Sequence, residues 1–244
     1  MALRPVFAPS LTGKSLVWKH EVDFLWFPGM SVKQAQKSID SLHHAAEKQL
    51  KVDKVLEISS KSKDPFGVKL SAFNLMIRTK KYGQEFSVEC AYQSAKVFEH
   101  GGPYKDIRGQ TSREAKSDPR LKESGRLVAF ELFGVRWPLQ PTTAFYDWLY
   151  INALHLHREL AEYVLQYRAF TDIAFNPERS LNCQAYSAAL YVSLHERRML
   201  TPDVLARKEA FLEAVRGLSA SPASARTESK DGAPGEGQDS FTFS

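Results

Sequence analysis

Residues 87–98 read SVECAYQSAKVF, a pattern typical of a helix that begins after a capping serine. The Ser87 side chain can accept a hydrogen bond from a free backbone N–H of the first turn, which predicts a helix over roughly 88–99. Glu89, Gln93 and Lys96 stand at i, i+4 and i+7 and therefore share one stripe of this helix. An apolar stripe lies beside it, made of Val88, Ala91, Tyr92, Ala95 and Phe98.

The polar stripe has two interpretations. A carboxylate, an amide and an amine beside a buried face could form a polar cluster at the rim of a pocket. They could also be ordinary pairs on a solvated helix surface. Spacing alone favours the solvated surface. The position of Glu89 in the first turn suits its negative charge in either case.

A polar turn precedes this helix in residues 60–75, SKSKDPFGVKLSAFNL. Lys61 lies before the glycine of the turn, and Ser71 and Asn74 follow on a segment, 67–75, that we predict to be a short strand. Taken as a bare pattern, this segment indicates no more than a polar turn.

A third polar segment is FTDIAFNPERSLNCQA, residues 170–185. Asp172, Asn176, Asn182 and Gln184 stand among apolar neighbours there. Asp and Asn commonly shape turns and cap helices, and this accounts for Asn176. It accounts less well for Asp172, which is held between apolar neighbours.

The rest of the chain predicts a mainly α fold with a few short β-strands. Alternating patterns predict further strands at 15–27, 53–59 and 127–137. Capping and periodic patterns predict further helices at 32–47 after Ser31, at 112–125, 142–167 and 180–198, and from Pro202 onward. We expect one domain over residues 1–216. Residues 217–244 are rich in Ser, Gly, Ala and Pro and are expected to be a disordered tail.

The 244 residues carry a formal net charge of +5. Residues 217–244 contribute −2, so the predicted domain carries +7. A basic excess suits an anionic partner such as a nucleotide or a nucleic acid, although such an excess is also common by chance.

Several classes of protein are disfavoured. Two cysteines, Cys90 and Cys183, are too few for a disulfide framework, so a reducing cytoplasm is expected. The sequence shows no signal-peptide pattern and no long apolar run, so no membrane association is expected. Motifs of zinc proteases, serine hydrolases and nucleotide-binding loops do not occur, and no metal or cofactor is expected.

Read in order, the three polar segments resemble the NADAR family. SKSKDPFGVKLSAFN resembles its turn leading into G-x-L-S-N-F, and SVECAYQSAKVF resembles its S-x-E-H-x-x-Q-x-x-K-F helix. REAKSDPRLKESGR, residues 113–126, is similar to its E-A-K-x-x-G-R segment, and FTDIAFNP stands where the family has T-G-D-x-x-L-x-E. The resemblance covers roughly residues 55–200.

The resemblance is closest to the NADAR antitoxins paired with DarT-type DNA ADP-ribosyltransferase toxins. The residues that carry it are LEISSKS, LSAFNL, KVFEHGGPY, FYDWLYINAL and FTDIAFNPERSLNCQA. It implies a mainly helical fold with a little β structure. It also implies an N-glycosidase that removes ADP-ribose from guanine bases in DNA, with a toxin as a candidate partner.

The sequence departs from the broad family at several positions. The histidine after the glutamate is Cys90, and the Asn of S-N-F is displaced to Asn74. The glycine of T-G-D is missing before Asp172, and the second acid is Asn176. These departures are expected of the antitoxin branch.

The resemblance implies roles for particular residues. We expect Glu89 to be the general acid/base and Asp172 to stabilise the developing charge or orient water, because glycoside cleavage needs both functions. A proposed Schiff-base intermediate needs a neutral lysine, for which Lys96 and Lys61 are rivals. The expected substrate-binding residues are Ser71, Phe73, Asn74, Gln93, Tyr146, Trp148, Asn176 and Asn182. Tyr146 or Trp148 would stack on a base, although aromatic residues in FYDWLYINAL are more typical of a core.

Two other functions remain open. Some NADAR-like proteins are associated with hydrolysis of ribosylated pyrimidine intermediates of riboflavin synthesis. A protein that only binds ADP-ribose or a toxin, without chemistry, is the alternative from another class.

Overall fold

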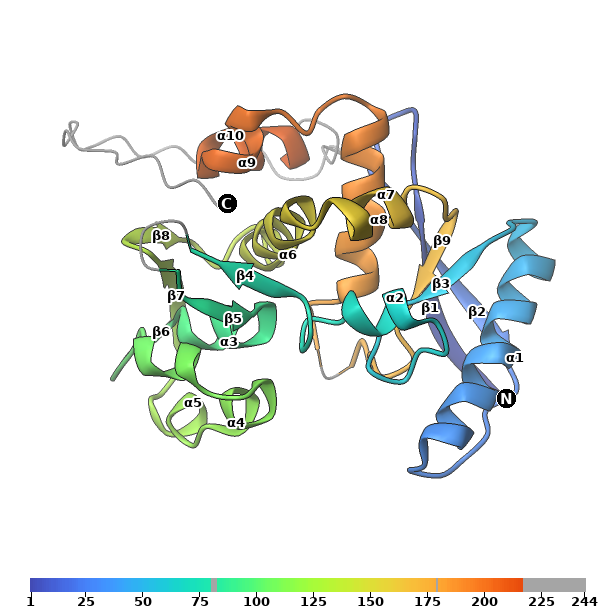
Figure 1. The fold of residues 1–244 in the computed structure, drawn as a ribbon, viewed down its shortest axis with the longest axis horizontal. Coiled ribbons are helices and arrows are strands. Elements are labelled where there is room, and N and C mark those ends of the chain that lie inside the picture. The colour runs from blue at the N-terminus through green and yellow to red at the C-terminus, as the bar shows by residue number, and fades with distance from the viewer. Residues whose placement is uncertain (80–82, 179, 217–244) are drawn as a thin grey trace, which may run out of the picture.

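The computed structural model describes residues 1–79, 83–178 and 180–216 and shows a mixed α/β fold (Figure 1). Helices hold 44% of these residues and strands 19%, so the expected mainly α class is roughly right but understates the strands. The predicted tail, 217–244, lies outside the described residues. No helix in the described ranges is long and apolar enough to cross a membrane.

A four-stranded sheet has the order β2-β1-β9-β3. β1 (Ala2–Pro9) pairs antiparallel with β2 (Val17–Phe24), and β9 (Ala169–Thr171) runs parallel to β3 (Val55–Glu57). The register sets Glu57 opposite Thr171. Two chain segments more than a hundred residues apart therefore end side by side, and Asp172 follows directly after β9.

Helix α1 (Val32–Leu50) packs against this sheet. Ser31 caps it as predicted, because its side chain accepts a hydrogen bond from the Gln34 N–H at 3.2 Å. The buried face of α1 carries Ile39 and Leu42 and forms a small core with strand residues such as Val22.

A second group of elements surrounds the short helix α3 (Val88–Ser94). The hairpin β4 (Met76–Arg78) and β5 (Glu85–Ser87) leads into it, and a three-stranded sheet follows, with β6 (Lys96–Phe98), β7 (Leu127–Leu132) and β8 (Val135–Trp137). Between β6 and β7 lie the 3₁₀ helix η1 (Lys105–Gly109), α4 (Ser112–Ser117) and α5 (Arg120–Glu123).

Two central helices join these groups (Figure 1). They are α6 (Ala144–Leu156) and α8 (Gln184–Glu196), which pack on each other and are buried almost all round. The remaining helices are α2 (Pro65–Lys69), α7 (Arg158–Val164), α9 (Pro202–Ala206) and α10 (Lys208–Arg216).

Five predicted elements were wrong in extent or type. The helix expected over 112–125 is split into α4 and α5, and the strand expected over 127–137 is the hairpin of β7 and β8. The strand expected at 67–75 is instead the helix α2 and a turn, because Asp64 caps the Phe66 and Gly67 N–H groups and Pro65 suits a helix start. The helix expected to reach residue 99 ends at Ser94, where β6 pairs with β7 instead. The helix expected over 142–167 breaks at His157, whose ring Nε2 is 2.7 Å from the Met76 carbonyl.

Candidate active site

A cavity of about 740 Å³ opens between α3, the segment after α2, and the segment that joins β9 to α8. This volume lies within the usual range of ligand pockets. Nine of the residues predicted to form the site line it: Ser71, Phe73, Glu89, Gln93, Lys96, Tyr146, Asp172, Asn176 and Asn182.

Helix α3 supplies the floor of the cavity and is anchored at its start. The Ser87 Oγ accepts from the Cys90 N–H at 3.1 Å, and the Glu89 N–H donates to the Ala72 carbonyl at 2.9 Å. The helix is packed on almost every side, so Glu89 and Gln93 are each only 6% exposed. The solvated-surface interpretation of this stripe is therefore wrong.

Two amide oxygens in the cavity have no hydrogen-bond partner among the residues that the structure describes. Gln93 donates from Nε2 to Glu89 Oε1 at 2.9 Å, and Asn182 donates from Nδ2 to the Tyr92 hydroxyl at 2.6 Å. The other ends of both amides, Gln93 Oε1 and Asn182 Oδ1, are buried and accept no hydrogen bond from the described residues. An unfilled buried acceptor costs about 1–3 kcal/mol, so the cavity suits a ligand that brings hydroxyl or N–H donors.

Lys96 reaches the cavity from β6, with its Nζ 5.0 Å from the centre of the Tyr92 ring. Burial lowers the pKa of Lys96, the neighbouring charge of Lys116 acts in the same direction, and Glu89 opposes both. A lowered pKa increases the share of neutral amine, which is the nucleophilic form of lysine.

Hydrogen bonds to both carboxylate oxygens hold Asp172 in place. Its Oδ1 accepts from the Ala174 N–H and its Oδ2 from Gln184 Nε2, both at 3.0 Å. Gln184 also donates to the Ile58 carbonyl at 2.6 Å and accepts from the Ala72 N–H at 2.7 Å. One side chain thus fixes three segments that line the cavity.

A second carboxylate, Glu57, lies buried behind Asp172. It accepts from the hydroxyls of Ser59 and Thr171, both at 2.6 Å, and from the Ile173 N–H at 2.9 Å. Burial raises the pKa of Glu57, but these three donors favour its charged form. The pKa of Asp172 is raised to about 7. Burial is the larger cause, and the negative charge of Glu57 is the second.

A family model of DarT1-associated NADAR antitoxins matches residues 2–225. The chain belongs to this family. No curated protein matches the chain. In this NADAR antitoxin, predicted residues from each of the three polar segments line the same cavity. Ser71 and Asn182, which both line it, are more than a hundred residues apart in the sequence.

Three predicted site residues of the NADAR antitoxin do not line the cavity. Trp148 is 6% exposed in the core, where its indole N–H donates to the Leu205 carbonyl at 2.9 Å, so it is not available to stack on a base. Asn74 turns back onto its own turn and donates to Val68 O and Ser71 Oγ. Lys61 is half-buried beside the cavity wall, with its backbone N–H bound to Ser59 Oγ.

Asn176 was predicted both to shape a turn and to bind substrate, and its position is compatible with both roles. Its Oδ1 accepts from the Glu178 N–H at 3.0 Å, as a residue that shapes a turn does, and it also lines the cavity.

Sequence reasoning missed several residues of this site. Lys116 lines the cavity and holds its Nζ 5.3 Å from the Phe73 ring centre. It lies in the REAKSDPR segment, which was noted only for its resemblance. Tyr92 was assigned to an apolar stripe, and Gln184 was noted as polar but given no role. Glu57 was noted only within LEISSKS, as part of the resemblance, because its place in the site depends on a strand pairing that its own segment does not reveal.

Proposed function

We propose that this NADAR antitoxin is an N-glycosidase that cleaves the bond between ribose and a guanine base in DNA and so removes ADP-ribose. The observation that carries the proposal is the convergence of Glu89, Asp172 and Lys96 on one cavity that also holds two unpaired amide acceptors. Carboxylates on both sides of a reacting sugar and an amine of lowered pKa are the groups that such a cleavage requires.

The first step needs a proton on the leaving base and stabilisation of positive charge at ribose C1. Glu89 would give the proton to the guanine nitrogen, and the Asp172 carboxylate would stabilise the oxocarbenium-like transition state. Gln93 would hold Glu89 in position through its Nε2 and accept from a ribose hydroxyl with Oε1.

Lys96 would form the covalent intermediate. Its neutral amine attacks ribose C1, and the bond to guanine breaks as the base takes the proton from Glu89. The C1–O4 bond of the ribose then opens as a proton moves from the lysine nitrogen to the ring oxygen, which leaves the opened ribose joined to Lys96 as a Schiff base. Water then adds to the C1 carbon while the Glu89 carboxylate, now acting as the base, takes a proton from it. Hydrolysis of the Schiff base frees ADP-ribose and the lysine amine. The sum is substrate plus water giving guanine plus ADP-ribose.

Binding of the diphosphate falls to Lys116. Among the described residues that line the cavity, Lys96 and Lys116 are the only cations. With Lys96 at the sugar, Lys116 is the charge suited to a phosphate, and Phe73, over which it lies, offers an aromatic face for a base.

The test is release of ADP-ribose from an oligonucleotide that carries one ADP-ribosylated guanine, followed by mass spectrometry. The wild-type protein should restore guanine, Glu89→Gln should not, and Glu47→Gln on the exposed face of α1 should behave as wild type. Cleavage of a ribosylated pyrimidine but not of modified DNA would move the function to small-molecule hydrolysis. Tight ADP-ribose binding without turnover would leave a binding-only antitoxin.

A further inference from the structure

A second cavity, of about 330 Å³, lies on the other side of the C-terminal end of α3. Ser94 lines this cavity, whereas its neighbours Gln93 and Lys96 line the first one. The other walls come from η1, which supplies Lys105 and Arg108, and from the turn of the β7–β8 hairpin, residues 131–134. No role in the proposed chemistry uses these residues.

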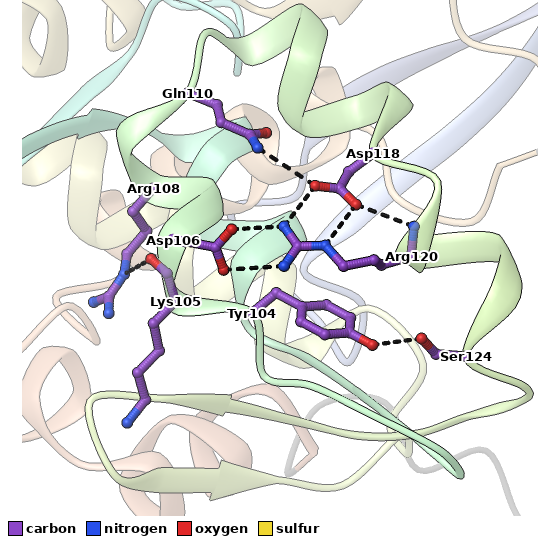
Figure 2. A network of polar contacts seen from close by, with 8 residues as sticks. All are labelled: Tyr104, Lys105, Asp106, Arg108, Gln110, Asp118, Arg120 and Ser124. Atoms are coloured by element: carbon purple, nitrogen blue, oxygen red, sulfur yellow. Dashed lines mark hydrogen bonds and ion pairs between the residues drawn. The ribbon is translucent and has the colours of Figure 1, made fainter.

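The two cations share one face of η1 because of its geometry. A 3₁₀ helix has three residues per turn, so side chains at i and i+3 lie directly above one another. Lys105 and Arg108 have this spacing, while Asp106 between them points elsewhere. Figure 2 shows Lys105 and Arg108 extending away from the side on which Asp106 meets Arg120.

The carboxylates around the second cavity are paired with other arginines. Arg120 forms ion pairs with Asp106 at 2.6 Å and with Asp118 at 2.7 Å, and its guanidinium lies 4.5 Å from the Tyr104 ring centre (Figure 2). Glu131, the one acid that lines the second cavity, is 3.9 Å from Arg136. Neither Lys105 nor Arg108 forms an ion pair with a carboxylate of the described residues.

Two aromatic rings and one hydrogen bond hold the Arg108 side chain, and its terminal nitrogens are left available for a ligand. Its guanidinium lies 5.2 Å from the Phe133 ring centre and 5.8 Å from that of Phe86, and its Nε donates to the Lys105 carbonyl at 3.2 Å. Burial lowers the pKa of Arg108, as expected for a cation without a counter-charge. Its two terminal nitrogens donate to no acceptor in the described ranges, and this planar pair suits two oxygens of a phosphate.

We propose that the second cavity is a phosphate site for the DNA strand, with Arg108 and Lys105 binding a phosphodiester near the modified guanine. This inference rests on the proposed function, which puts the modified base in the first cavity. The two cavities flank one end of α3, so a strand whose base enters the first can present a neighbouring phosphate to the second. The site would supply affinity for DNA without touching the sugar that reacts.

The test compares two substrates and two charge changes. Lys105→Gln with Arg108→Gln should raise KM for the modified oligonucleotide by about tenfold and reduce the salt slope of log(kcat/KM) by about one to two. The same variant should cleave ADP-ribosylated guanosine, which has no neighbouring phosphodiester, at the wild-type rate. Lys14→Gln with Lys48→Gln removes two exposed charges elsewhere and should change neither.

The results separate this proposal from the proposed function. Equal losses in the control variant, or a loss on ADP-ribosylated guanosine, would overturn the phosphate site. If the wild-type protein cleaves neither substrate, fluorescence anisotropy with an unmodified single-stranded oligonucleotide still decides the question, since only the Lys105/Arg108 variant should bind more weakly. Arg108→Lys keeps the charge but loses the planar pair of nitrogens, so its binding should lie between that of wild type and that of Arg108→Gln, which guards against a variant that merely folds poorly.

Discussion

Gln93 donates to Glu89 Oε1 at 2.9 Å, while its own Oε1 stays buried without a donor from the described residues. The amide therefore has one end fixed on the candidate acid and the other facing the cavity. Gln93→Met keeps the volume and removes both functions. We expect kcat/KM for ADP-ribose release to fall by about tenfold, since each hydrogen bond contributes about 0.5–1.5 kcal/mol.

The matched control is Gln110→Met. Gln110 also has an unpartnered buried Oε1, but it lies outside the cavity. Equal losses of kcat/KM in the two variants would contradict the role of Gln93 at the substrate.

The pH dependence should report on Asp172. This carboxylate must be charged to stabilise the transition state, and its pKa of about 7 means that the rate rises as pH increases through neutrality. Glu57→Gln removes the neighbouring charge that, after burial, contributes to this raised pKa, so the rising limb should move to lower pH. The Thr171 hydroxyl, which donates to Glu57, lies 2.9 Å from His43 Nε2, and burial lowers the pKa of His43 to about 4. The neutral His43 ring can therefore accept from Thr171 while Thr171 accepts from the new amide. A limb that stays in place in Glu57→Gln would show that Asp172 does not set it.

Borohydride added during turnover should trap the sugar on Lys96. Lys96 lines the cavity and has a lowered pKa, whereas Lys61 does not line it. Peptide mapping by mass spectrometry should find the adduct in wild type and in Lys61→Arg but not in Lys96→Arg. An adduct on neither lysine would remove the covalent step from the mechanism.

Lys116 should contribute to the affinity for the diphosphate. Lys116→Gln removes an exposed cation from the cavity wall, and we expect the Kd for ADP-ribose to rise by roughly 5- to 20-fold, with less effect at high salt. Isothermal titration calorimetry at two salt concentrations measures this, with Lys122→Gln on neighbouring α5 as the control. An unchanged Kd in Lys116→Gln, or an equal rise in Lys122→Gln, would refute the assignment.

Trp148 should matter for stability and not for chemistry. Its ring packs 5.0 Å from that of Trp137, and its indole donates to Leu205 O. Trp148→Ala should lower the free energy of unfolding by about 3–5 kcal/mol in urea titrations, whereas Trp148→Phe should cost less. The specific activity of folded Trp148→Phe should match wild type, and a selective loss of activity would reopen the stacking role.

The sequence by itself determined the local signals and the family. Ser31 and Ser87 cap helices as their side chains predict, because capping depends on residues only three positions away. The order of the three polar segments was enough to predict the NADAR resemblance, which the family match over residues 2–225 confirms. Glu89 and Asp172 were selected in the same way, although their roles stay predictions.

Tertiary structure decided which polar residues share the cavity, and it shifts the pKa values of Asp172 and Lys96. Spacing could not tell a solvated stripe from a buried one, because burial of Glu89 and Gln93 comes from segments distant in sequence. Likewise, Glu57 stands behind Asp172 only because β3 pairs with β9, and Lys116 reaches the cavity only because α4 packs against α3. Desolvation and charge proximity depend on such long-range contacts, and local sequence does not encode them.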